Sequence, residues 1–388
     1  MKTVWKVLSY VIVAVLASVA TLSIAPVNVS IGNTEYNKLD QLGDLIEERF
    51  IGETDRTAME DAAAAAMVDS IGDRWSYYMS TETYQAHLQQ VNNSYVGIGV
   101  TIQVSEEVEG FEIIQINTGG PAAEAGRQIG DRIVAVAGTD VRGMTTSETA
   151  LLVKGEEGTF VDITVVRGDS ELTLSVERRQ VLVEVTSYQM LEDNIGLITI
   201  TNFDTRCADE TISAIDTLLE QGAKSLIFDV RNNPGGYKDE LVKVLDHLLP
   251  EGPLFRSEDY KGVVQVDESD AACVEVPMAV LVNGNSYSAA EFFAAALREY
   301  DAAIVVGNPT TGKGYFQTTI RLYDGSAVNL SIGKYTTPNG VSLAEAGGLV
   351  PDIQVEVDEE TDLSIYAGIL EPSADPQIQA AVEALKSE

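Results

Sequence analysis

The 388-residue sequence is poor in side chains that hold metals or nucleic acids. It has two histidines, two cysteines and 25 Lys plus Arg against 60 Asp plus Glu, which gives a net charge of −35. It contains neither a C-x-x-C pair nor an H-E-x-x-H motif, which excludes structural zinc sites, zincin-type metalloproteases and disulfide-rich scaffolds. With so few basic residues on an acidic chain, a nucleic-acid partner is excluded as well.

One hydrophobic run stands out near the amino terminus, at residues 7–24, after Lys2 and Lys6 and before Pro26. Its length is at the lower limit for a membrane-spanning helix, and the preceding positive charges predict a cytoplasmic amino terminus. Two interpretations stay open. We favour a retained single-pass anchor in the cell membrane, with the rest of the chain extracytoplasmic. The alternative is a signal peptide that is cleaved near Ala20, which would give a secreted protein. After export, Cys207 and Cys273 either pair or remain free thiols.

Hydrophobic content of 45% predicts a real core, and the length predicts two or three domains. The fold class is a mixed α/β multidomain protein. Beyond the anchor region at 1–33, the pattern is helical over 34–92, rich in short strands over 93–180, and again helical over 359–388. Between them, over 181–358, strands alternate with helices, which predicts a largely parallel sheet. The strands are expected at 194–200, 225–230, 278–283 and 302–307, the helices at 208–222, 238–249 and 288–300, and a hairpin follows around Asp324.

Several motifs that suggest chemistry fail on closer inspection. The segment before Ser288 resembles a nucleophile elbow without its final glycine, and His247 lies within a predicted helix, so a histidine-assisted serine is disfavoured. A P-loop-like segment ends in Gly314 instead of Ser or Thr and leads into a strand, which removes the helix terminus that binds phosphate. Ser331 and Lys334 form an S-x-x-K match, but on a strand they point to opposite faces.

A serine paired with a lysine remains. Ser288 lies where a buried strand turns into a helix, which places the Ala289 amide beside a developing oxyanion. Lys313 follows the next strand, and neighbouring parallel strands bring both loops to one edge of the sheet. Gly235 and Gly236 follow a third strand and could supply a second oxyanion amide. The alternative on composition alone is three ordinary surface loops.

The same residues carry a resemblance to a known family. D-V-R-N-N-P-G-G at 229–236, V-L-V-N-G-N-S-Y-S-A-A-E at 280–291 and T-G-K-G-Y-F-Q at 311–317 occur in the order and spacing of three family signatures. S-I-G-D-R-W-S-Y-Y at 70–78 resembles a fourth. The sequence thus resembles the carboxy-terminal processing (tail-specific) proteases, serine peptidases that carry a PDZ domain. Tyr287 departs from the family's small residue before the nucleophile and could narrow the substrate cleft.

The resemblance implies an endopeptidase that cleaves near protein carboxyl termini through an acyl-enzyme. It implies that Ser288 is the nucleophile, Lys313 the general base and Gln317 the group that orients the lysine amine, with no metal and no cofactor. Lys313 must be neutral to act, and lowering its pKa from about 10.4 to about 7 costs roughly 4–5 kcal/mol. We therefore expect a buried pocket away from carboxylates.

The resemblance also predicts a PDZ domain over 93–180. Its carboxylate-binding loop would comprise Gly97, Ile98, Gly99 and Val100, and a peptide would add as a strand beside the helix at 146–153. The partners would be proteins or peptides with free apolar carboxyl termini. Relatives further suggest a homodimer and an activating partner protein. Two rival functions stay open: an inactive PDZ scaffold, and a hydrolase of non-peptide substrates with the same dyad.

Overall fold

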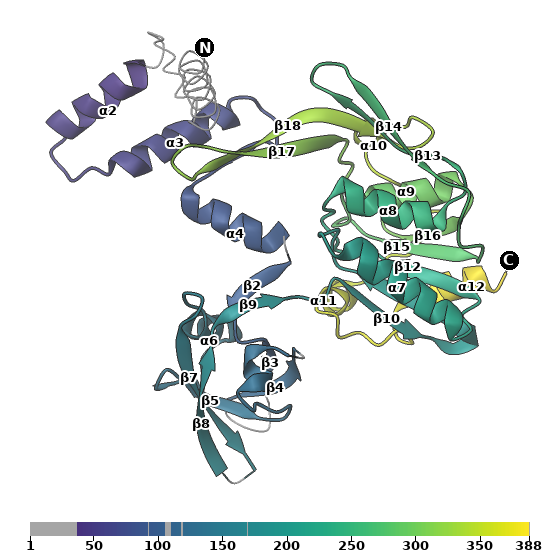
Figure 1. Ribbon diagram of the computed structural model, residues 1–388, viewed down its shortest axis with the longest axis horizontal. Helices are drawn as coiled ribbons and strands as arrows, with labels where there is room; N and C mark the ends of the chain where they lie inside the picture. Colours follow the sequence, from purple (N-terminus) through teal and green to yellow (C-terminus); the bar gives the residue numbers. More distant parts are fainter. Residues whose placement is uncertain (1–36, 92, 105–109, 118, 169, 388) are drawn as a thin grey trace, which may run out of the picture. The chain divides into compact units, whose positions relative to one another are not determined.

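The computed structural model describes residues 37–91, 93–104, 110–117, 119–168 and 170–387, in two compact units divided after Ser70 (Figure 1). The predicted membrane segment at 7–24 lies outside these residues. Over the described ranges, no helix is long and apolar enough to cross a membrane. The first unit contains the helices α2 (Asn37–Arg49) and α3 (Arg56–Asp69). The Asp55 carboxylate accepts a hydrogen bond from the Ala58 amide and so starts α3.

The second unit begins with a turn and a short strand that interrupt the predicted helical region. Asp73 accepts hydrogen bonds from the Trp75 amide and the Ser76 hydroxyl, at 3.1 and 2.6 Å. These bonds hold the backbone in a turn, so the chain leaves it extended, as β1 (Tyr77–Met79), before α4 (Thr81–Val91). β1 pairs antiparallel with β18 (Ala327–Thr336).

The region predicted to be a PDZ domain is a strongly twisted sheet closed by two short helices. Its sheet has the strand order β3-β4-β5-β7-β8, with β6 added beside β5, while β2 pairs with β9 where the chain enters and leaves. The strands are β2 (Ser94–Gly97), β3 (Val100–Val104), β4 (Phe111–Ile116), β5 (Arg132–Val136), β6 (Thr139–Asp140), β7 (Phe160–Arg167), β8 (Ser170–Glu177) and β9 (Arg179–Leu182). The helices are α5 (Pro121–Glu124) and α6 (Thr146–Val153). The predicted capping box, Thr145 with Glu148, starts α6.

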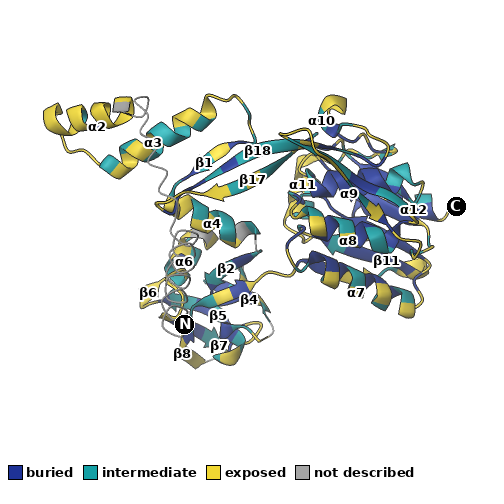
Figure 2. Cartoon of the chain, turned by 45° about the horizontal axis from the view of Figure 1, so that its top comes forward, coloured by how far each residue is buried: buried dark blue, intermediate teal, exposed yellow. Residues whose placement is uncertain are grey.

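The predicted strand–helix alternation forms a six-stranded sheet of order β10-β11-β12-β15-β16-β19. All neighbouring strands are parallel except the edge strand β10. The strands are β10 (Thr186–Met190), β11 (Ile195–Ile200), β12 (Ser225–Asp229), β15 (Met278–Val282), β16 (Ala303–Gly307) and β19 (Ile353–Gln354). Both faces are covered, because every residue of β12 and β15 is buried (Figure 2).

The helices divide between the two faces of this sheet. One apolar core includes side chains from α7 (Cys207–Glu220), α8 (Lys238–Leu248) and α9 (Ala289–Glu299). The other face packs against α12 (Pro376–Leu385) through Ile378, Val382 and their neighbours. The tail also holds α11 (Glu359–Tyr366), and α10 (Leu343–Ala346) precedes β19.

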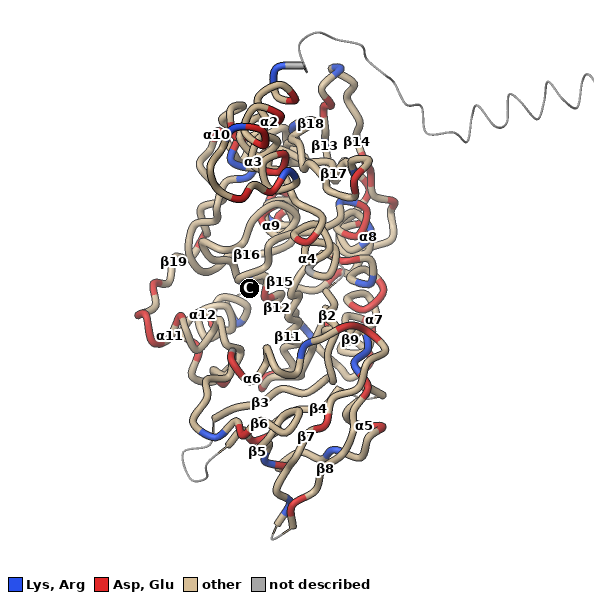
Figure 3. Tube along the Cα trace, turned by 90° about the vertical axis from the view of Figure 1, so that its left-hand side faces the viewer, with Lys and Arg blue, Asp and Glu red and all other residues tan. Residues whose placement is uncertain are grey.

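A second sheet, in which all neighbouring strands are antiparallel, adjoins the core. β17 (Tyr315–Arg321) and β18 form the hairpin predicted around Asp324, and β13 (Gly252–Asp259) and β14 (Val264–Ser269) extend it in the order β1-β18-β13-β14. Acidic residues are spread over the loops and helices of the described chain (Figure 3). Both cysteines are free thiols here, and burial raises the pKa of Cys207 to about 12.

Candidate active site

The predicted nucleophile occupies a strained turn between a buried strand and a buried helix. Ser288 follows β15, immediately precedes α9, and has φ 60° and ψ −124°. A non-glycine residue rarely adopts a positive φ, and this backbone exposes a hydroxyl on a sharp strand-to-helix turn, as at nucleophile elbows. The first turn of α9 also presents the Ala289 amide beside the serine.

The glycine pair at the end of β12 lies against this turn. A Cβ atom built on Gly235 would stand 2.7 Å from Ser288 Cβ and 2.8 Å from the Ala289 nitrogen, so only glycine allows this approach. The Gly235 amide donates to Asn233 Oδ1 at 2.8 Å, so its hydrogen is already engaged. No hydrogen bond from the Gly236 amide is present among the described residues. The structure therefore packs Gly235 against Ser288 and Ala289, with Gly236 next in the chain. Within the pair, the Gly236 amide is the candidate donor, because that of Gly235 is engaged.

A single buried carboxylate joins the serine turn to the lysine loop. Glu291 is fully buried on α9, and its Oε2 accepts from the backbone amides of Ser288 at 3.1 Å and Lys313 at 2.9 Å. Its Oε1 accepts from the Thr310 hydroxyl at 2.5 Å and the Gly312 amide at 2.6 Å. Two loops far apart in sequence thus share one anion. Glu291 is the last residue of the motif at 280–291, but no role was predicted for it.

Lys313 is partly buried beneath aromatic rings. Its Nζ lies 4.7 Å from the centre of the Trp75 ring and 5.9 Å from that of Tyr287, and these two rings are 5.8 Å apart. Burial lowers the pKa of Lys313 to about 8, although the charges of Glu291 and Asp73 act in the opposite direction. The lysine is only partly buried, yet burial is still the main cause of its lowered pKa, as expected; the expectation of a pocket away from carboxylates is wrong.

Gln317, four residues after Lys313, lies on β17 beside a β-bulge. Its Nε2 donates to the Tyr315 carbonyl and to the Ser331 hydroxyl, both at 3.0 Å, and the Ser331 amide donates to Ser76 Oγ. Among the described side chains, no hydrogen bond joins Gln317 to Lys313. Its role in orienting the lysine remains a prediction.

The predicted carboxylate-binding loop joins β2 to β3. Gly97 ends β2, Ile98 is buried, Gly99 has φ 75°, and Val100 begins β3. The carbonyls of Ile98 and Gly99 accept hydrogen bonds from residues of the same domain, at 2.9 and 3.0 Å. β3 is an edge strand of the described sheet and contacts α6, which is the arrangement that peptide strand addition needs.

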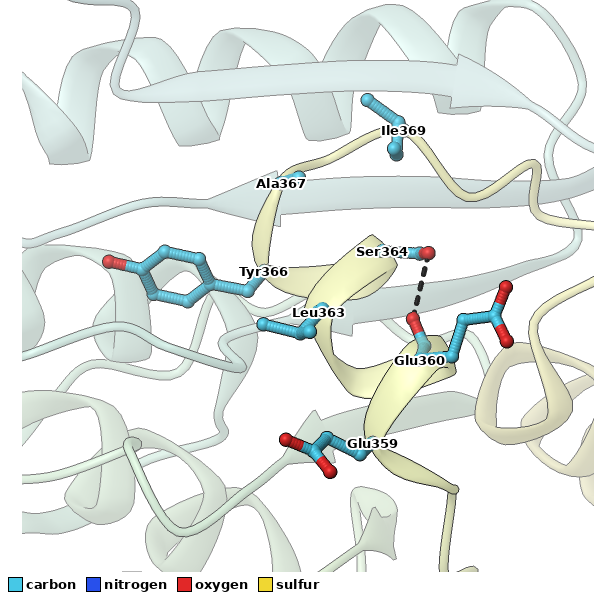
Figure 4. A pocket seen from close by; sticks show the side chains of 7 residues that line it. All are labelled: Glu359, Glu360, Leu363, Ser364, Tyr366, Ala367 and Ile369. Atoms are coloured by element: carbon cyan, nitrogen blue, oxygen red, sulfur yellow. Dashed lines mark hydrogen bonds between the residues drawn. The ribbon is translucent and has the colours of Figure 1, made fainter. Parts of the chain in front are cut away.

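A pocket elsewhere in the tail does not compete with this site. It is lined by Leu363, Ser364, Tyr366 and neighbours on α11 and the residues after it, and its one drawn hydrogen bond runs from the Ser364 hydroxyl to the Glu360 carbonyl (Figure 4). None of the predicted catalytic residues lines it. In the described part of the chain, no group of acidic, histidine or cysteine residues could hold a metal ion.

A PDZ-like sheet followed by an α/β core with a strained serine defines the class of PDZ-containing serine peptidases. The model of Peptidase family S41 matches residues 194–355, and that of the PDZ domain matches residues 96–177. Carboxy-terminal processing protease CtpA of Bacillus subtilis is 33% identical over 91% of this chain and 77% of its own length. The chain therefore belongs to the carboxy-terminal processing proteases of family S41 and is a serine-type peptidase.

Other proteases are similar to this chain as well. A probable CtpA-like serine protease of Staphylococcus haemolyticus is 29% identical over 85% of this chain and 67% of its own length. The solved photosystem II D1 C-terminal processing protease matches with a TM-score of 0.50 and 25% identity, covering 89% of this chain and 100% of that one. A putative S41 protease from Bacteroides fragilis has a TM-score of 0.58 at 15% identity, covering 89% and 97%, and shows the fold alone.

Proposed function

We propose that this chain is an exported endopeptidase of Ser-Lys type that captures the carboxyl termini of unfolded proteins and hydrolyses peptide bonds near them. One observation carries the mechanism: the Glu291 carboxylate ties the backbone of Ser288 to that of Lys313, whose side chain is partly buried. Burial supports the neutral amine that a general base requires, since charging an amine away from water is costly.

In this mechanism the neutral Lys313 Nζ accepts the proton of Ser288 Oγ as the oxygen attacks the peptide carbonyl. The amides of Ala289 and Gly236 hold the negative oxygen of the tetrahedral intermediate. The protonated lysine then gives its proton to the leaving amine, and an acyl-enzyme remains. Water attacks the ester with Lys313 again as base, and the serine recovers its proton.

Substrate capture is assigned to the PDZ loop. Backbone amides of Ile98, Gly99 and Val100 would bind the terminal carboxylate, and the peptide would extend along the edge of β3 beside α6. Because this capture uses mainly backbone groups, it supports broad selection of apolar tails. The strongly acidic chain, with a net charge of −35, disfavours acidic substrates.

Export rests on the hydrophobic run at residues 7–24, either as an anchor that leaves the peptidase outside the cell membrane or as a cleaved signal peptide. The homodimer and the activating partner remain predictions. Fractionation of cells, followed by protease protection of the full chain, tests export and retention together.

The activity test uses the full chain and an unfolded reporter with an apolar tail. Wild type should cleave it, whereas Ser288→Ala and Lys313→Ala should not, and a reporter with an amidated tail should be cleaved more slowly. Full activity of Lys313→Ala would refute the base assignment. Binding of the tail without cleavage favours the scaffold, and cleavage of esters alone favours the non-peptide hydrolase.

A further inference from the structure

A buried tyrosine beside the nucleophile has a hydroxyl that the fold does not use. Tyr335 lies on β18 and is 4% exposed. Its hydroxyl oxygen is buried and has no hydrogen-bond partner of normal geometry among the described residues. A buried polar group without a partner destabilises the fold, so its presence requires an explanation.

Tyr335 contacts residues that are hydrogen-bonded to, or adjacent in sequence to, each of the two proposed dyad residues, Ser288 and Lys313. Its ring lies 5.8 Å from that of Phe292, in an edge-on arrangement, and the Phe292 amide donates to the Ser288 carbonyl at 3.0 Å. The Tyr335 amide donates to the carbonyl of Gly314, the residue after Lys313, at 3.0 Å. The Phe255 ring, 5.4 Å away, closes the other side. Rigid neighbours therefore fix the position of the ring.

The hydroxyl and the serine side chain are close enough to affect each other. Burial raises the pKa of Tyr335, the Glu291 charge raises it further, and Ser288 partly offsets the rise as a hydrogen-bonding neighbour. The phenol therefore stays protonated throughout the working pH range and acts as a donor. Hydrogen bonds of this kind are often loose in a free enzyme and tighten when substrate binds.

We propose that Tyr335 is a positioning residue for the nucleophile: its hydroxyl donates a hydrogen bond to Ser288 Oγ and leaves the serine proton directed at Lys313. The inference rests on the proposed Ser-Lys mechanism. The bond strengthens as negative charge develops on Oγ during attack, and again when Oγ leaves the acyl-enzyme. No proton passes to or from the tyrosine, and the serine proton still moves to Lys313.

Tyr335→Phe removes only the oxygen and keeps the ring in place. Because that oxygen lacks a partner, the melting temperature should stay the same or rise. Labelling of Ser288 by a fluorophosphonate probe should slow by about 10–100-fold, as expected for one hydrogen bond to a developing charge. The loss should be equal at pH 7 and pH 9.5, since Lys313 itself is unchanged, and binding of a tail peptide to the PDZ domain should not change.

Tyr300→Phe is the matched control. Tyr300 follows the last turn of α9, and its hydroxyl donates to the Pro253 carbonyl at 3.0 Å. This variant should lose melting temperature and keep the wild-type labelling rate, which is the reverse of the result expected for Tyr335→Phe.

Three results would separate the inference from the mechanism beneath it. Wild-type labelling rates in Tyr335→Phe would overturn the role of the hydroxyl. A lowered melting temperature with slower labelling would overturn it as well, because the oxygen would then be structural. Failure of the wild-type full chain to label at Ser288, at pH 7 or 9.5, would instead refute the proposed function itself.

Discussion

The pH dependence of cleavage follows from the lowered pKa of the partly buried Lys313. Only neutral Lys313 can accept the serine proton, and burial lowers its pKa to about 8. The neutral fraction is then about 1% at pH 6, about 10% at pH 7 and about half at pH 8. We expect kcat/KM to rise about tenfold per unit up to pH 7 and to level off near pH 9.

The assay measures kcat/KM between pH 6 and 9.5 with a fluorogenic peptide that carries an apolar free carboxyl terminus, while circular dichroism confirms that the chain stays folded. The sign is definite: the base is lost as pH falls through the folded-state pKa of Lys313. A flat profile, or one that still rises about tenfold per pH unit between pH 8.5 and 9.5, as for a solvent-exposed lysine, would refute this assignment. Ser288→Ala sets the background rate.

Asp73→Asn tests the same dependence of kcat/KM on the pKa of Lys313. The charge of Asp73 raises the pKa of Lys313, and an asparagine can still accept the Ser76 hydrogen bond that Asp73 accepts at 2.6 Å. Removing the charge should therefore shift the midpoint of the profile to lower pH. A shift to higher pH would show that the turn, and not its charge, determines the environment of the lysine.

Most of the fold is predictable from the sequence because the buried strands are uninterrupted apolar runs, and their alternation with helices allows few topologies. The hairpin of β13 and β14 was not predicted. Its alternation is diluted by charges, as expected for a sheet with one exposed face. β1 was overlooked because its pairing partner, β18, lies about 250 residues further along the chain.

Some residues of the candidate site are predictable from the sequence and others are not. Ser288, Lys313 and the glycine pair follow strands, so topology alone brings them to one edge of the sheet. Trp75, Glu291 and Tyr335 gain their roles through tertiary contacts that no local pattern records. For Glu291, the sequence did hold a signal: it lies three residues after Ser288, in the first turn of a buried helix, where a carboxylate needs hydrogen-bond donors from other segments.

Three further predictions test the structure around the site. Glu291→Gln places an amide donor against two backbone donors, so the free energy of unfolding should fall by about 2–4 kcal/mol in urea titrations, and kcat/KM by more than 100-fold. Raising NaCl from 0.1 to 1 M should raise the melting temperature, because salt screens the repulsion within a chain of net charge −35; an unchanged or lower value would contradict this. Asp375→Asn should lower the free energy of unfolding by about 1.5–3 kcal/mol, because it removes one carboxylate from the buried guanidinium of Arg231.

The Asp375 prediction has a matched control in the same tail. Asp375 caps α12 through the amides of Gln377 and Ile378, and its other oxygen lies 2.8 Å from Arg231, four residues before Gly235. Asp358 caps α11 in the same way but is exposed. Since asparagine is as good a cap as aspartate, Asp358→Asn should change the free energy of unfolding by less than about 0.5 kcal/mol. Equal effects of the two substitutions would mean that the cap matters and the buried ion pair does not. A larger loss of unfolding free energy in Asp375→Asn than in Asp358→Asn, together with a fall in kcat, would mean that α12 helps to hold the loop that carries Gly236.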